Sequence, residues 1–92
     1  MPKRIRQFIF RGKKYIIRWR KMKGLGLCDP PDKKDKAITI NSTLRGQELL
    51  RVAIDESIHA CFWDLDDAMV GEASASISEF LHAIGFRHID DE

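Results

Sequence analysis

The apolar residues in the second half of the chain recur at the spacing of α-helices. Over residues 46–62 they follow the i, i+3, i+4 rule, which predicts an amphipathic helix of about four turns. A second run over residues 67–84 has the same spacing and stops before Gly85, a residue that suits a helix end. Because the connection between the two runs is short, we predict that the two helices are antiparallel neighbours. The acidic residues of this connection suit the positive end of the second helix's dipole.

The first half of the chain is typical of β-structure. Residues 4–10 and 14–20 are rich in β-branched and aromatic side chains, and the turn at residues 11–13 separates them. We therefore predict a basic β-hairpin over residues 1–20. Residues 37–41 alternate in the same way and predict a third strand that pairs with the hairpin.

Residues 21–36 contain glycine, consecutive prolines and charge without periodicity, so we predict a loop that is functional or mobile. Its Gly24 and Gly26 lack the third glycine and the Lys-Ser/Thr of a phosphate loop. Residues 86–92 are expected to form a tail. The prediction is one α+β domain, in which the hairpin and third strand form a small antiparallel sheet covered by two antiparallel helices.

Composition places the chain among intracellular globular proteins. Its 92 residues suffice for one modest core, with 43% hydrophobic and 33% charged residues. No apolar run is long enough to cross a bilayer, and the basic N-terminus lacks the apolar region of a signal peptide. The two cysteines are too few to predict a disulfide framework.

The net charge of +2 conceals a steep asymmetry along the chain. Residues 1–36 carry 13 basic and 3 acidic side chains, whereas residues 37–92 carry 3 basic and 11 acidic ones. This split indicates either a basic face for a polyanion or two halves that lie against one another. Cationic side chains interleaved with aromatic ones favour a nucleic-acid-binding surface on the hairpin. The alternative is that the charged face of the hairpin is only solvated. The candidate nucleic-acid-binding residues are Arg4, Arg6, Lys13, Lys14, Arg18 and Arg20.

Candidate chemistry lies inside the predicted helix over residues 46–62. Asp55 and His59 are four residues apart and therefore point the same way, with Glu56 one step round the same edge. The stretch is one substitution away from His-Glu-x-x-His, in which two histidines bind zinc and the glutamate polarises a water molecule. A solvated helix edge with an ordinary i, i+4 pair is the alternative interpretation.

The antiparallel arrangement predicts where a third metal ligand would lie. A partner at the depth of Asp55 and His59 falls roughly three to eight residues into the second helix, where Glu72 lies. Three protein ligands and an open position are typical of catalytic metal sites. Because two carboxylates and one imidazole form a hard ligand set, manganese is a candidate beside zinc.

The sequence between residues 26 and 87 resembles small zincin-like proteins encoded by bacteriophages, which are similar in pattern to the core of SprT-like metallopeptidases. The resemblance rests on Gly26-Leu27-Cys28-Asp29, Lys36-Ala37-Ile38-Thr39-Ile40, Glu48-Leu49-Leu50, the run from Ile54 to Leu65, and the run from Val70 to Phe86. It implies a strand that leads into an active-site helix and a second helix that carries a third ligand.

In this resemblance Glu56 matches the catalytic glutamate and His59 the second metal ligand, while Asp55 replaces the first histidine. The metzincin continuation is absent, since Phe62 and Leu65 stand at its glycine and third histidine. Two hypotheses follow. The first is a small metal-dependent hydrolase, acting on a protein or peptide in the host cytoplasm if the chain is phage-encoded. The second is an inactive zincin-fold adaptor that uses the basic hairpin for contact.

Overall fold

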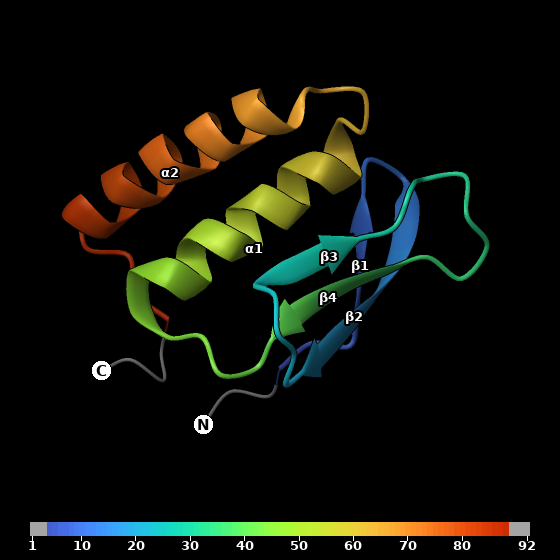
Figure 1. Ribbon diagram of the computed structural model, residues 1–92, viewed down its shortest axis with the longest axis horizontal. Helices are drawn as coiled ribbons and strands as arrows, with labels where there is room; N and C mark the ends of the chain where they lie inside the picture. Colours follow the sequence, from blue (N-terminus) through green and yellow to red (C-terminus); the bar gives the residue numbers. More distant parts are fainter. Residues whose placement is uncertain (1–3, 89–92) are drawn as a thin grey trace.

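The computed structural model describes residues 4–88 and has an α+β fold, which confirms the predicted class. The elements are strands β1 (Gln7–Phe10), β2 (Lys13–Arg20), β3 (Gly26–Cys28) and β4 (Ala37–Asn41), then helices α1 (Gly46–Cys61) and α2 (Asp67–Ala83). Figure 1 shows α1 lying across one face of the sheet and α2 lying on α1, on the side away from the strands. The predicted hairpin, third strand and two helices are therefore all present.

The hairpin closes through a tight turn between β1 and β2. Arg11 and Gly12 both have positive φ angles, 49° and 79°, as a two-residue turn requires if its twist is to match the flanking strands. The Arg11 guanidinium stacks 4.8 Å from the Phe62 ring centroid and donates a hydrogen bond of 2.9 Å to the Cys61 carbonyl. These contacts attach the hairpin turn to the end of α1.

The sheet has the strand order β1-β2-β4-β3, and it is mixed rather than antiparallel throughout. The segment predicted as a loop contains the short strand β3, which pairs antiparallel with β4. Strand β4 lies between β3 and β2 and runs parallel to β2, with Ile38 beside Ile17. The Asp29 carboxylate accepts a hydrogen bond of 2.9 Å from the Ala37 backbone N–H and closes the β3–β4 connection. Because β3 pairs with β4 alone, it is one edge of the sheet.

The hydrophobic core lies between the sheet and α1. Tyr15 and Ile17 of β2 face the helix, where Leu49, Val52 and Ala60 are buried. Helix α1 is covered on its other side by α2, so the molecule has three layers, whereas the sequence predicted both helices on the sheet. The side of α2 that is buried carries Val70, Ser74 and Ser78.

The small side chains at the α1–α2 contact explain the third layer. Ser74 and Ser78 are completely buried, and two helices approach closely where such residues lie between them. From Leu49 to Cys61, every residue of α1 is buried or half-buried, so this stretch is a central element rather than a surface helix.

The two helices begin in different ways. The Asp66 carboxylate caps α2 and accepts a hydrogen bond of 2.9 Å from the Ala68 N–H, as its acidic start predicted. Helix α1 follows Arg45, which provides no side-chain cap. The side-chain amide of Asn41, the last residue of β4, donates hydrogen bonds to the Met22 and Gly24 carbonyls and so holds the chain between β2 and β3.

The end of the chain adds no further strand within the described residues. Residues 86–88 are irregular, and the remainder of the predicted tail, residues 89–92, lies outside them. Neither of the two described helices is both long and apolar enough to cross a membrane.

Candidate metal centre

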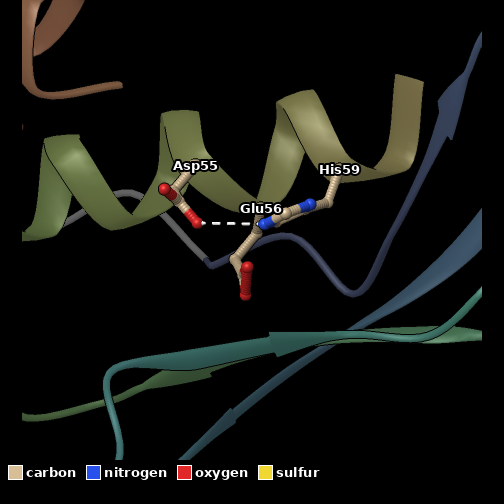
Figure 2. A group of neighbouring side chains, drawn as sticks. All are labelled: Asp55, Glu56 and His59. Carbon is tan, nitrogen blue, oxygen red and sulfur yellow. Dashed lines mark ion pairs between the residues drawn. The ribbon is translucent and has the colours of Figure 1, made fainter. Parts of the chain in front are cut away.

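Three potential metal ligands gather on one side of α1. Asp55, Glu56 and His59 each offer a ligand atom, and these atoms all lie within 4.8 Å of one another. Figure 2 shows the side chains of Asp55 and His59 turned toward each other, and the Glu56 carboxyl group extending from α1 toward the neighbouring strand. The grouping predicted from the i, i+1, i+4 spacing is confirmed.

The distance between Asp55 and His59 suits two ligands of one metal ion. His59 Nε2 lies 3.4 Å from Asp55 Oδ2, and the two side chains are only 16% and 25% exposed. Two atoms that are each about 2.1 Å from a tetrahedral metal ion are about 3.4 Å apart. The edge of the His59 ring faces Trp63, with centroids 6.3 Å apart, which restricts the orientation of the imidazole.

Glu56 is the most buried carboxyl group of the site. It is 5% exposed, and its Oε2 has no hydrogen-bond partner in the part of the chain that the structure describes. Burial, followed by the negative charges of Asp55 and Asp67, raises the pKa of this carboxyl to about 7. A buried oxygen without a partner is costly, so this geometry is typical of a group that has a ligand or a reactive proton.

A cleft of about 440 Å³ opens in front of these side chains. Its floor is α1, and its opposite wall is β3, where Gly26 and Cys28 face the helix because they pair with the core residues Ile40 and Ile38. Burial, followed by the charge of Glu56, raises the pKa of the Cys28 thiol to about 12. Cys28 is therefore a neutral thiol at the wall of the cleft.

Strand β3 approaches α1 closely at Gly26. A Cβ atom built on Gly26 would lie 3.0 Å from Val52 Cγ1 and 3.1 Å from Glu56 Oε2. It would also lie 3.1 Å from the backbone carbonyl of Thr39 in β4. The glycine thus brings the edge-strand backbone next to the Glu56 carboxyl group.

The structure does not bring Glu72 into this group. Glu72 lies in α2 three to eight residues after the helix begins, as predicted. The rotation of α2 about its axis, however, turns Val70 and Ser74 toward α1 and leaves the Glu72 side chain exposed on another side. The α2 carboxylate that lies near the pair is Asp67, with Oδ1 3.9 Å from His59 Nε2 and a side chain that is 97% exposed. The position between Asp67 and Ser74 on the buried side is Gly71, which has no side chain to offer.

Ser74 is a site residue that the sequence analysis missed. Its side chain is fully buried, and its hydroxyl donates a hydrogen bond of 2.9 Å to Asp55 Oδ1. Because Oδ1 is occupied in this way, Oδ2 is the oxygen directed at His59. A serine inside a helix carries no functional signal in the sequence, and only the contact between α1 and α2 reveals its partner.

The six cations predicted for nucleic acid lie apart from this cleft, on the hairpin and the segment before it, and none of them lines it. No protein-family model matches the chain, and no curated protein or solved structure is significantly similar to it.

Proposed function

We propose that this chain is a small zincin-like metal-dependent hydrolase that cleaves peptide bonds at the Asp55-Glu56-His59 site. One observation carries the proposal: the 3.4 Å pair of Asp55 and His59 stands beside a buried, partnerless glutamate in an open cleft. The resemblance of residues 26–87 to phage-encoded zincin-like proteins supports the same interpretation.

The donor atoms fit zinc or manganese. Asp55 Oδ2 and His59 Nε2 would hold the ion, and the exposed carboxylate of Asp67 lies near enough to be a third donor. A bound divalent ion supplies a polarised water molecule and an electrophile for the substrate carbonyl. Because the set contains more oxygen than nitrogen atoms, manganese competes well with zinc.

Glu56 has the properties of a general base for such a reaction. A base is most effective when its pKa lies near the working pH, and burial raises the pKa of Glu56 to about 7. Its carboxylate accepts a proton from water and can return it to the leaving amine of a cleaved peptide. Its buried Oε2 lies beside Gly26, so the proton-accepting carboxyl group and β3 line the same cleft.

The edge strand supports a peptide as the substrate. Strand β3 pairs with β4 on one side only, so its other side presents backbone donors and acceptors to the cleft. An extended peptide can add to such an edge by main-chain hydrogen bonds. The small cleft has few side-chain pockets, which favours a narrow range of substrates.

The test combines metal content with activity. We expect protein purified without chelator to bind about one zinc or manganese ion by plasma mass spectrometry and calorimetry. Asp55→Ala and His59→Ala should lose the metal, while Glu72→Ala, on the exposed side of α2, should retain it. Glu56→Gln should keep the metal and lose cleavage of a fluorogenic peptide mixture.

The inactive adaptor is the second candidate, and a specific observation favours it. Between Asp67 and Ser74, the corresponding position of α2 is Gly71, which adds no metal-ligating side chain. A wild-type protein that binds no metal after dialysis against excess zinc or manganese would reject the hydrolase and favour the adaptor. A protein that binds metal but cleaves no peptide would reject only the catalytic part.

A further inference from the structure

The outer face of the sheet is basic and is covered by neither helix. Side chains alternate along β2, so Tyr15 and Ile17 enter the core while Lys14, Arg18 and Arg20 are exposed on the opposite face. Figure 1 shows both helices on the other side of the sheet. The described part of the chain therefore leaves this row of cations open to a partner.

Within residues 4–88, the acidic half of the chain forms no ion pair with the basic strand β2 or the segment before β1. Among residues 4–88 the ion pairs join Lys33 to Asp29, and His59 to Asp55 and Asp67. None of these pairs involves a cation of β1, β2 or the segment that precedes them. Of the two explanations for the charge asymmetry, the structure favours the basic face.

Four arginines concentrate this charge around one groove of about 520 Å³. Arg4 and Arg6 line it from the segment before β1, and Arg18 and Arg20 line it from β2. The Arg4 guanidinium is stacked 4.5 Å from the Trp19 ring centroid. The Trp19 indole in turn donates a hydrogen bond of 3.0 Å to the Ile5 carbonyl, which fixes the N-terminal segment along β2. The groove is thus held by defined contacts.

We infer that this arginine groove, formed by Arg4, Arg6, Arg18 and Arg20, binds the phosphate groups of single-stranded nucleic acid. Guanidinium groups match phosphate geometry with two parallel hydrogen bonds, and none of the described residues that line the groove is a carboxylate that would compete for them.

Apolar side chains on the same face favour a single strand over a duplex. Ile16 lines the groove, and Ile9, which pairs with Lys14 on the neighbouring strand, is 63% exposed. Such side chains can lie against the faces of bases, which a single strand exposes and a duplex stacks against one another. The inference does not depend on the metal centre, which uses other residues.

The test is fluorescence anisotropy with a labelled oligonucleotide of about 20 thymidines, a length that spans one or more small binding sites. Titrations at a series of salt concentrations from about 50 to 200 mM compare wild type with Arg18→Gln/Arg20→Gln. The matched control, Lys33→Gln/Lys34→Gln, removes the same charge from exposed positions between β3 and β4. A second groove variant, Arg4→Gln/Arg6→Gln, tests the opposite wall. Circular dichroism verifies that every variant is folded.

We expect wild-type binding that weakens with salt, and at least a tenfold loss at low salt in each groove variant. The slope of log K against log salt should fall by about 1.4, because two phosphate contacts are lost at about 0.7 each. The control should retain the wild-type slope. Absence of wild-type binding at low salt, or equal weakening in the control, would overturn the inference. Tighter binding to a duplex of the same length, or to phosphatidylserine vesicles, would overturn it as well.

Discussion

The hydroxyl of Ser74 on α2 donates a 2.9 Å hydrogen bond to Oδ1 of Asp55 on α1. The two residues are 19 positions apart in the chain, and the serine is fully buried. This bond makes the second helix part of the site, because it fixes the carboxylate whose other oxygen lies 3.4 Å from His59.

Replacing Ser74 should weaken both the fold and the metal site. Ser74→Ala leaves a largely buried carboxylate oxygen without its donor, which should lower the free energy of unfolding by about 1–3 kcal/mol in urea denaturation. Metal affinity should fall about tenfold by calorimetry, because Asp55 loses the partner that orients it.

Ser78→Ala is the matched control for this prediction. Ser78 is 1% exposed and lies one turn further along α2, but its hydroxyl bonds only to the Ala75 carbonyl of its own helix. Since alanine favours helix, this variant should be close to neutral. Equal effects of the two substitutions would argue that Ser74 is only a packing residue.

Ionisation of Glu56 should make the metal-free protein less stable as the pH rises. Its pKa is raised from 4.5 in the unfolded chain to about 7 in the folded protein, so the folded state favours the protonated form. The free energy of unfolding is therefore highest below pH 4.5 and falls by about 3 kcal/mol as the pH rises to 7. Urea denaturation from pH 4 to 8 measures this slope.

Glu56→Gln should remove most of that slope and be more stable than wild type at pH 8. Glu72→Gln, which alters an exposed carboxylate on α2, should leave the slope unchanged. Parallel stability curves for wild type and Glu56→Gln would show that Glu56 ionises without cost and would contradict the role of burial.

A methyl group at position 26 should disrupt the wall of the cleft. In Gly26→Ala the new Cβ meets Val52 Cγ1 at 3.0 Å, Glu56 Oε2 at 3.1 Å and the rigid Thr39 carbonyl at 3.1 Å. Strand β3 must then move away from α1, which should cost about 1–3 kcal/mol in thermal or urea unfolding. Gly24→Ala is the control, because its nearest neighbour is the flexible Met22 Cε at 3.6 Å. A stable Gly26→Ala with unchanged peptide cleavage would argue against close packing at β3.

An acidic side chain at position 71 should strengthen metal binding. Gly71 lies on the side of α2 between Asp67 and Ser74, and a Cβ there meets nothing within 4 Å. Gly71→Glu therefore places a carboxylate beside Asp55 and His59 and should raise zinc affinity at least tenfold by calorimetry. Gly71→Gln gains the same helix propensity without the charge and should bind zinc like wild type. Equal affinities in the two variants would mean that position 71 does not face the ion.

Local patterns were sufficient to predict the parts of the site that lie on one element. Asp55, Glu56 and His59 come together because residues i, i+1 and i+4 share one side of a helix, whatever surrounds it. The tight turn at residues 11–12 is local in the same sense, since positive φ angles and a glycine define the hairpin. These interactions need no knowledge of distant residues.

The sequence predicted which part of the second helix lies level with Asp55 and His59, but it did not predict how that helix is rotated about its own axis. Rise per residue placed the stretch three to eight residues into α2 beside the motif, and Ser74 lies there. The rotation that turns Ser74 inward and Glu72 outward depends on the packing of buried side chains. A carboxylate at the right depth therefore points into solvent, and a serine without any sequence signal contacts Asp55.

The chain by itself thus determined the hairpin, the two helices and the motif on α1, because each depends on contacts within a few residues. Only the tertiary structure decided that β3 forms the edge beside Glu56, that β4 runs parallel to β2, and that α2 contributes Ser74. A strand as short as Gly26–Cys28 has too few residues to show a pattern, and its pairing with β4 and its contact with α1 create it.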